Sequence, residues 1–508
     1  MTSSANHIET HNLLKSKRLR LYTQDEVIVL MRTDCPVCIS EGLTSRSRVR
    51  LTSVSGREII ATLYQVDNDW LTTGEAGLSE AAWAKLGIED GADIAVSHVP
   101  TIGSLADIRR RIYGGRLDEP AFQGIIGDIA AGRYADIHLA TFIATCSALP
   151  LDIEEICHLT KAMVGAGERL SWDAPMILDK HCVGGLPGNR TTPIVVAIVA
   201  SLGFTMPKTS SRAITSPAGT ADTMETLAPV DLDLKQMRRV VEEQGACIAW
   251  GGAVNLSPAD DILIRIERAL DIDTEGQLIA SVLSKKIAAG ATHVVLDLPV
   301  GLTAKVRSLD KAKTLGAHLS AVAANFGLET RCVFTDGSQP VGRGIGPALE
   351  AHDVLSVLQN NPDAPQDLKE RAILIAAQAL ELANHVETGD GLAAAQAALV
   401  DGRAWNKFQA ICEAQGGMRT PPVAPLTCPL LAQSSGKISS IDNRKLSRLA
   451  KLAGAPRQKA AGLAIHFRLG DHVTNGQPLF TVHAEAKGAL DYALEYAAAN
   501  PDILKIEE

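Results

Sequence analysis

Residues 174–202 carry an apolar run, a glycine-rich loop and a second apolar run, in that order. The loop, residues 179–188, reads DKHCVGGLPG, and Thr191-Thr192-Pro193 opens the second apolar run. A strand, a glycine loop and a helix in this order form one unit of a parallel α/β sheet. The loop amides and the positive end of the helix dipole face the same space, so they attract an anion. The segment therefore predicts a parallel sheet with an anion site at the end of a strand.

A second segment of this kind follows about thirty residues later. Residues 208–216 read KTSSRAITS and residues 219–222 read GTAD, so hydroxyls, basic residues and a glycine precede another helix start. Lys180 is expected to add a full charge at the mouth of the first loop. Two anion-binding loops on successive βα units predict an enzyme that handles phosphate.

The overall charge shows that such a phosphate site must be a local basic pocket. The 508-residue chain has a net charge of −9, which gives no support for binding to nucleic acid or to an anionic membrane surface. Hydrophobic residues make up 46% and charged residues 21%, as in ordinary soluble globular proteins. At roughly 150 residues per domain, the length predicts about three or four domains.

The N-terminus and the cysteines indicate a cytoplasmic location. Residues 1–25 are polar and lack the apolar core of a signal peptide, and the apolar run 194–200 is too short to span a membrane. Cys35 and Cys38 form the single CxxC pair among nine cysteines, whereas a zinc ribbon would need a second pair. We therefore expect buried, reduced thiols and no metal site.

Hydrophobic periodicity predicts a multidomain α/β fold. Short alternating stretches predict a small N-terminal β-rich domain, and a 3.6-residue period after Ser104 predicts a helical domain. Alternating strand and helix signals predict an α/β domain with a mainly parallel sheet, and prolines at 417–437 mark a linker before a C-terminal α+β domain. The expected bounds are 1–99 for the β-rich domain, 100–173 and 257–289 for the helical domain, 174–256 and 290–420 for the α/β domain, and 430–508 for the C-terminal domain.

Four motifs in a fixed order resemble the thymidine/pyrimidine-nucleoside phosphorylase family. They are DKHxxGG at 179–185, SRxxxx at 211–216, GTxD at 219–222 and ASxxSKK at 280–286. Residues 208–222 (KTSSRAITSPAGTAD) are most similar to the long branch that contains the archaeal-type AMP phosphorylases, which also carries an extra N-terminal domain. The resemblance implies a helical domain that faces an α/β domain across a cleft, whose closure excludes water.

The resemblance assigns phosphate to the α/β side of the cleft. Lys180, Gly185, Thr191 and Thr220 are the implied phosphate-binding residues, although both threonines also fit a helix N-cap role. Cys182 stands where the shorter thymidine phosphorylases carry a serine that contacts phosphate. A thiol is a weaker donor than a hydroxyl, so Thr191 or Thr192 would have to replace that contact.

The substrate residues follow from the same resemblance. Arg212 can hold a phosphate through two hydrogen bonds, and together with Lys208 it predicts a substrate with a 5′-phosphate. Ser281 and Lys285 lie four residues apart on one helix face and would bind the base, whereas Lys286 is expected to be solvated. The implied substrate-binding residues are Ser211, Arg212, Ala213, Ile214, Thr215, Ser216, Ser281, Lys285 and Lys305; for Lys305, an ordinary surface position is the alternative.

Three residues are implied in catalysis. Asp273 aligns with the proposed proton donor to the departing base, a role that requires a raised pKa, although an Asp-Ile-Asp stretch is also common on surfaces. Lys180 would orient phosphate, and His181 would line the sugar or base side, with a structural hydrogen bond at the turn as its alternative. The Gly342-Arg343-Gly344-Ile345-Gly346 run lacks a dinucleotide-binding context and is interpreted as structural.

The sequence thus predicts a phosphorolytic pentosyltransferase. Inorganic phosphate would displace the base from C1′ of a nucleoside or nucleoside 5′-monophosphate, without a metal or an organic cofactor. Thymidine phosphorylase is the alternative; a magnesium-dependent phosphoribosyltransferase and a non-catalytic nucleotide-binding protein are less favoured. The expected partners are small molecules, not nucleic acid or membranes, and the resemblance implies a homodimer or a higher homo-oligomer.

Overall fold

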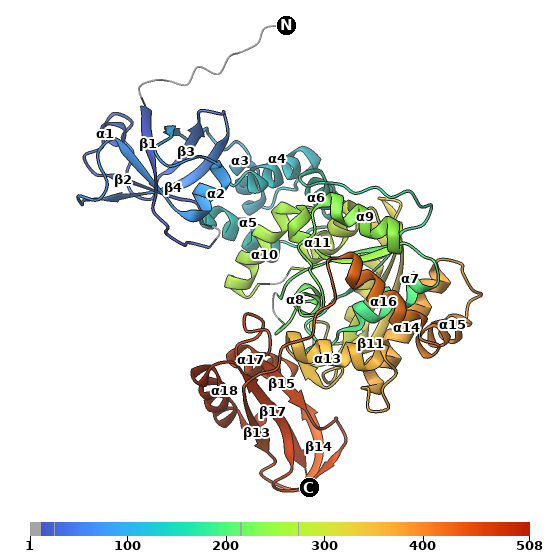
Figure 1. Ribbon diagram of the computed structural model, residues 1–508. Coiled ribbons are helices and arrows are strands. Elements are labelled where there is room, and N and C mark those ends of the chain that lie inside the picture. The colour runs from blue at the N-terminus through green and yellow to red at the C-terminus, as the bar shows by residue number, and fades with distance from the viewer. Residues whose placement is uncertain (1–11, 25, 214–215, 273, 508) are drawn as a thin grey trace. The chain divides into compact units, whose positions relative to one another are not determined.

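The computed structural model describes residues 12–24, 26–213, 216–272 and 274–507 (Figure 1). Two compact units divide the chain, Met1–Thr145 and Cys146–Glu508. Both helices and strands build the chain, so the prediction of a mixed α/β multidomain fold is confirmed. No helix within the described ranges combines the length and the apolar character needed to cross a bilayer.

The first unit contains a closed six-stranded barrel. Along β3 (Arg48–Ser53) every second side chain is buried, because alternate residues of a strand point to opposite faces. Cys35 and Cys38 are buried in the same core. The strands follow the order β1 (Leu13–Arg18), β5 (Glu75–Leu78), β2 (Ile28–Arg32), β4 (Glu58–Val66), β3 and β6 (Asp93–His98), with α1 (Pro36–Ser40) and α2 (Glu80–Leu86) beside them.

Three helices follow the barrel. They are α3 (Leu105–Ile112), α4 (Glu119–Ala130) and α5 (Asp136–Ala148). Asp118 begins α4 as a side-chain cap that accepts a hydrogen bond from the Ala121 N–H. Ser104 and Tyr134 hydrogen-bond at 2.7 Å, which ties the start of α3 to the segment after α4.

The second unit is built on parallel strands. β7 (Leu178–Cys182), β10 (His293–Val300) and β11 (Glu329–Asp336) pair in parallel, as do β8 (Met206–Ser210) and β9 (Ala246–Trp250). A bridge from Ile177 to Thr205 links the two groups. The parallel pairing agrees with the strand–loop–helix pattern in the sequence.

The helix after the first glycine loop lies in the core of the second unit. In α7 (Thr191–Ser201) residues 191–200 are all buried, as an apolar run without a polar face requires. The helix packs against α14 (Gln366–Leu382) and α16 (Arg403–Ala414). The other helices beside these strands are α8 (Thr220–Glu225), α9 (Leu234–Gln244), α12 (Leu309–Ala324), α13 (Pro347–Leu358) and α15 (Gly391–Val400).

Two segments far apart in the sequence form a helical layer. α6 (Ile153–Gly165) packs against α11 (Glu275–Ala288), and α10 (Pro258–Leu270) lies beside them. Asp152 begins α6 with a capping box, in which its side chain and that of Glu155 each accept from the other residue's backbone N–H. The layer thus brings residues near 155 and near 280 together.

The C-terminal part holds two small antiparallel sheets. β14 (Gly436–Ile441) pairs with β16 (His472–Val473) and β18 (Leu504–Glu507), and α17 (Asn443–Leu452) and α18 (Lys487–Ala499) accompany them. The other sheet runs β12 (Gly344–Ile345), β15 (Gly462–Ile465), β17 (Pro478–Ala484) and β13 (Leu426–Leu431). The predicted linker at 417–437 is therefore wrong in part, because β13 lies within it. Pro429 is accommodated in that strand because β13 is at the sheet edge.

The glycine run at 342–346 has a structural role, as the sequence suggests. A Cβ atom on Gly346, whose φ is +126°, would lie 2.3 Å from the Ala461 carbonyl oxygen. Asp353 on α13 accepts from the backbone N–H groups of Arg343 (2.6 Å) and Gly344 (2.7 Å). The run thus carries the chain from α/β strands into the C-terminal sheet.

Asp353→Asn is expected to gain stability relative to the unchanged protein as pH rises from about 4 to about 6. Burial raises the pKa of the Asp353 carboxyl to about 6, whereas the unfolded chain ionises it near ~3.9. Between these values the folded chain binds more protons, so the carboxyl's contribution to stability falls as pH rises; an amide shows no such loss. The measurement is the melting temperature of the Asp353→Asn variant minus that of the unchanged protein, across about pH 4 to 7.5; this difference should rise with pH.

Asp502→Asn provides the control for this titration. Asp502 is exposed, and its hydrogen bond to Lys445 lowers the pKa of the carboxyl. The difference in melting temperature should not rise with pH for this variant. A difference that stays flat for Asp353→Asn as well would contradict the prediction.

Candidate active site

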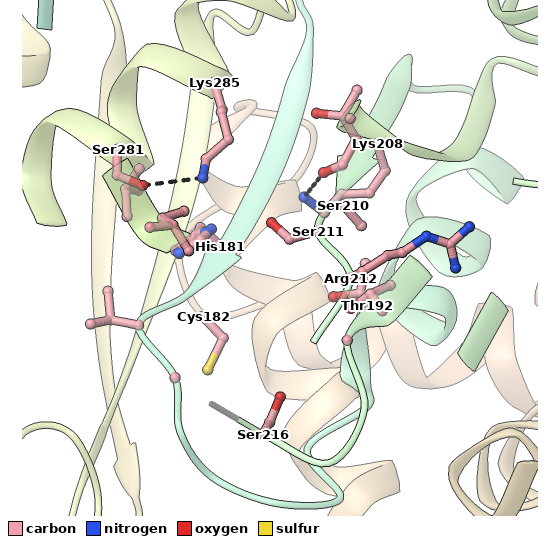
Figure 2. A pocket seen from close by; sticks show the side chains of 18 of the residues that line it. His181, Cys182, Thr192, Lys208, Ser210, Ser211, Arg212, Ser216, Ser281 and Lys285 are labelled. Atoms are coloured by element: carbon pink, nitrogen blue, oxygen red, sulfur yellow. Dashed lines mark hydrogen bonds between the residues drawn. The ribbon is translucent and has the colours of Figure 1, made fainter. Parts of the chain in front are cut away.

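A pocket of about 310 Å³ opens at the carboxyl ends of β7 and β8, within the second unit (Figure 2). Open parallel sheets bind ligands at this edge, and the volume suits a small molecule. The lining comes from both predicted anion loops, from residues 250–252 at the end of β9, from α10 and α11, and from Lys305. The structure thus brings the two loops and the Ser281–Lys285 helix around one space.

Lys180 lies in the floor of the pocket, not at its mouth. Its side chain is 1% exposed, and its Nζ donates to Thr191 Oγ1 at 2.8 Å. Burial lowers the pKa of the Lys180 ammonium. The predicted placement is wrong because alternation along β7 turns Lys180 inward, toward the start of α7.

The opposite face of β7 carries a buried charge cluster. Asp179, 2% exposed, forms ion pairs with Lys208 Nζ at 3.1 Å and with Lys286 Nζ at 2.8 Å. Burial alone would raise the pKa of Asp179, but the two ammonium charges lower it overall. The expectation that Lys286 is solvated is wrong: it follows Lys285 by one position, which places it on a different side of α11, against the sheet.

His181 faces a strongly positive environment. Burial, followed by the charges of Lys286 and Lys208, lowers the pKa of the His181 imidazole well below its ordinary value. The ring is therefore neutral near pH 7, with one nitrogen as a donor and the other as an acceptor.

Ser281 and Lys285 share one helix face, as their spacing predicts. Lys285 Nζ donates to Ser281 Oγ at 3.1 Å (Figure 2). It also donates to Asp260 Oδ2 on α10 at 2.6 Å. Asp260 therefore orients the ammonium that lines the pocket. Asp273, the predicted proton donor, lies outside the described residues.

Arg212 is held by carboxylates. Its guanidinium donates two hydrogen bonds of 2.9 Å to Glu225 and lies 4.7 Å from the ring centre of Trp250. Lys459 Nζ contacts the same Glu225 at 2.6 Å. The two cations predicted to receive a 5′-phosphate, Lys208 and Arg212, are thus both paired within the protein. Lys459 had no signal in the sequence, because it lies more than 200 residues from its partner.

The loop after β8 is fixed by Asp222. Its Oδ2 accepts from the backbone N–H groups of Ala213 (2.6 Å) and Gly219 (3.0 Å). Ser211 lines the pocket, as does Ser216, which donates to the Ala218 carbonyl at 2.8 Å. Ile214 and Thr215 lie outside the described residues.

The two threonines predicted to bind phosphate stand at helix starts, yet neither is an N-cap. Arg190 is the N-cap of α7 and Gly219 that of α8, so Thr191 and Thr220 are the first helical residues. Thr220 Oγ1 accepts from Arg190 Nη1 at 2.8 Å. No local sequence pattern singles out Arg190, because its partners are distant in sequence.

Cys182 accepts a hydrogen bond from Asn189 Nδ2 at 3.3 Å, and burial raises the pKa of its thiol. The group at this position is therefore a neutral thiol, not a hydroxyl or a thiolate. Gly185 adopts φ +86°, a conformation that favours glycine, and lines the pocket near Lys305.

The Lys305 loop is anchored by the C-terminal part of the chain. Asn443 donates to Thr303 Oγ1 through its backbone N–H (3.2 Å) and its Nδ2 (3.1 Å), and Nδ2 also reaches the Gly337 carbonyl at 3.0 Å. Asn443 is buried at the start of α17. The placement of Lys305 in the pocket wall thus depends on residues of the C-terminal part.

Within the described ranges, no cluster of three or more His, Cys, Asp or Glu side chains could hold a metal ion.

Comparisons with known proteins agree with this layout. The family model described as "Glycosyl transferase family, a/b domain" matches residues 174–405, and "Pyrimidine nucleoside phosphorylase C-terminal domain" matches residues 437–504. A protein of Chelativorans sp. (strain BNC1) named "Putative thymidine phosphorylase" is 63% identical over 495 residues, which cover 97% of each chain. A protein of the same name from Tolumonas auensis is 60% identical over 494 residues, which cover 97% of this chain and 98% of the relative.

Solved structures show the same fold in more distant proteins. Anthranilate phosphoribosyltransferase from Thermus thermophilus aligns with a TM-score of 0.52 at 19% identity, over 61% of this chain and 98% of that one. The Saccharomyces cerevisiae enzyme, in complex with PRPP and Mg, aligns with a TM-score of 0.52 at 15% identity, over 62% and 98%. The likeness shows a phosphoribosyltransferase-like α/β fold.

Proposed function

The chain belongs to the thymidine/pyrimidine-nucleoside phosphorylase family, and from this premise we propose that it cleaves the N-glycosidic bond of a nucleoside or nucleoside 5′-monophosphate with inorganic phosphate, in the manner of AMP phosphorylases. The chain is a pentosyltransferase of the phosphorylase class. The observation that carries the proposal is the single pocket in which two anion-type loops face the Ser281–Lys285 side of α11.

The proposed reaction is a displacement at C1′ of the pentose. A phosphate oxygen forms a bond to C1′ while the C1′–N bond breaks, and the electron pair of that bond passes to the base nitrogen, which takes up a proton. Positive charge on the sugar and negative charge on the base develop together. Protein groups that are already positioned around the phosphate and sugar and around the base therefore stabilise the transition state.

The pocket offers groups for each end of this reaction. Lys180 in β7, Gly185 in the first loop, and Thr191 and Thr220 at the starts of α7 and α8 are proposed to hold phosphate. Lys180, Gly185 and Thr220 line the pocket, and Thr191 is buried beside Lys180. Ser281 and Lys285 are proposed to bind the base, with the neutral His181 beside them as a hydrogen-bonding group. Asp273 is proposed as the donor of the proton to the base.

The substrate sugar is proposed to contact residues 211–216 and Lys305. The similarity of residues 208–222 to the AMP-phosphorylase branch supports a nucleotide. The ion pairs of Lys208 with Asp179 and of Arg212 with Glu225 favour the second candidate, a thymidine phosphorylase that acts on a sugar without a 5′-phosphate. The names of the relatives support the same candidate.

A panel of substrates tests the proposal. The purified full-length chain is incubated with thymidine, uridine, cytidine, AMP, CMP and UMP, each with and without inorganic phosphate, and released base and pentose 1-phosphate are quantified. Phosphate-dependent release from nucleotides alone supports the AMP-phosphorylase type, and release from thymidine or uridine supports the second candidate. Release that EDTA abolishes contradicts the proposal that no metal is required, and no release from any substrate contradicts the function itself.

The proposal includes two further expectations. The partners are small molecules and phosphate, and the active form is a homodimer or a higher homo-oligomer. Light scattering of the purified protein measures its oligomeric state, and a monomer that turns over substrate would contradict the expected oligomer.

A further inference from the structure

Arg190 connects the two anion loops of the pocket. It ends the first loop as the N-cap of α7, and its buried side chain reaches across to the second loop. Its Nη1 donates to Thr220 Oγ1 at 2.8 Å, and its Nη2 donates to the Ala218 carbonyl at 2.8 Å. One planar guanidinium therefore fixes the spacing between loops that are separated by about thirty residues of sequence.

Glu350 on α13 forms an ion pair with this guanidinium. Its Oε2 accepts from Arg190 Nε at 2.6 Å, and its Oε1 accepts from the backbone N–H of Gly346 at 3.1 Å. Glu350 is 1% exposed, so the ion pair is buried and poorly screened by solvent. The guanidinium plane is therefore set by α13 as well as by the two loops.

The hydrogen bond to Thr220 decides what that hydroxyl can do. A threonine hydroxyl has one proton to donate and two lone pairs that accept. Because Oγ1 accepts from Arg190, the O–H of Thr220 is directed away from the guanidinium, and Thr220 lines the pocket. A hydroxyl proton that points into the pocket can be donated to a phosphate oxygen.

We propose that Arg190 is a positioning residue for phosphate: it orients the Thr220 hydroxyl as a donor and fixes the distance between the two anion loops. The inference rests on the proposed function, in which Thr220 contacts phosphate. A lysine at position 190 keeps the charge but cannot bond Glu350, Thr220 and Ala218 at once, because it lacks the planar fork of donors.

A double-mutant cycle tests the inference. Wild type, R190K, T220V and R190K/T220V are compared by steady-state kinetics, with KM measured separately for phosphate and for the nucleoside or nucleotide that the panel identifies. R190K is expected to raise the KM for phosphate about tenfold and to change the KM for the other substrate less than about twofold. In the T220V background, R190K should add less than about a further twofold, because the hydroxyl that it orients is gone.

Two further variants keep the inference testable. T220S retains the hydroxyl and should retain the full effect of R190K. If R190K does not fold, as judged by circular dichroism, E350Q replaces it in the cycle, because the amide keeps the shape of Glu350 but loses its charge; the same coupling with T220V is expected.

The outcomes separate the two ideas. One outcome is that wild type shows phosphate-dependent turnover, while R190K and T220V raise the phosphate KM by factors that simply multiply in the double variant. This result overturns the positioning role and indicates that Arg190 contacts phosphate independently of Thr220. An equal rise in both KM values also overturns it, because a general distortion of the pocket would produce that result. Absence of turnover in wild type instead contradicts the proposed function.

Discussion

Lys180→Met is expected to lower kcat/KM for phosphorolysis by about 10²–10³-fold, the effect of removing one pre-placed charged donor from a transition state. Lys180 lies in the floor of the pocket beside Thr191, where low solvent exposure strengthens its field. Methionine fills similar space without the charge, so packing is largely kept. The measurement is initial-rate kinetics with the substrate found in the panel.

Lys235→Met is the matched control for this variant. Lys235 is exposed on α9, and its replacement should leave kcat/KM unchanged. Circular dichroism and the melting temperature establish that both variants are folded. A loss below about tenfold for Lys180→Met would remove Lys180 from the reacting groups.

Asp179→Ala is expected to destabilise the second unit by about 3–5 kcal/mol, because it leaves Lys208 and Lys286 buried without their shared carboxylate. For a domain of this size class, that corresponds to a fall in melting temperature on the order of 10 °C. Scanning calorimetry of the full chain measures the shift. Adding Lys286→Met to Asp179→Ala should restore part of the loss, since one uncompensated charge is removed with its partner.

The control for Asp179 is an exposed ion pair in the same unit. Arg239 and Glu243 pair at i, i+4 on α9, with side chains about half exposed. Glu243→Ala should cost less than about 0.5 kcal/mol. Equal shifts for Asp179→Ala and Glu243→Ala would show that the buried cluster contributes no more to stability than a surface pair.

Local sequence pattern predicts much of the framework around the pocket. The order of strand, glycine loop and helix is confirmed, and α7 takes up the second apolar run, because glycine at positive φ and helix starts depend on neighbouring residues. The strand is shifted: β7 shares only Leu178 with the first apolar run and includes the first four residues of the predicted loop. The i, i+4 spacing of Ser281 and Lys285 places both on one helix face for the same reason.

The charge partners could not be predicted in this way. Lys180 and Lys286 are buried, and Arg212 is paired, because of residues on other elements: Thr191, Asp179 and Glu225. Nothing within a short window of sequence specifies which face of an element meets which neighbour. The role of Arg190 depends in the same way on Glu350, which lies 160 positions away.

The C-terminal part is joined to the rest of the second unit in a way that affects how such a chain can be divided. Its sheet includes the short strand β12 from residues 344–345. Asn443 bonds Thr303, two residues before the pocket residue Lys305, and Lys459 contacts Glu225, the partner of the pocket residue Arg212. A gene shortened near codon 420 would leave β12 as an unpaired edge, a site for aggregation, and would remove two supports of the pocket. The C-terminal part is therefore not an independent module. Recombination could not add or remove it without changing the pocket that it supports.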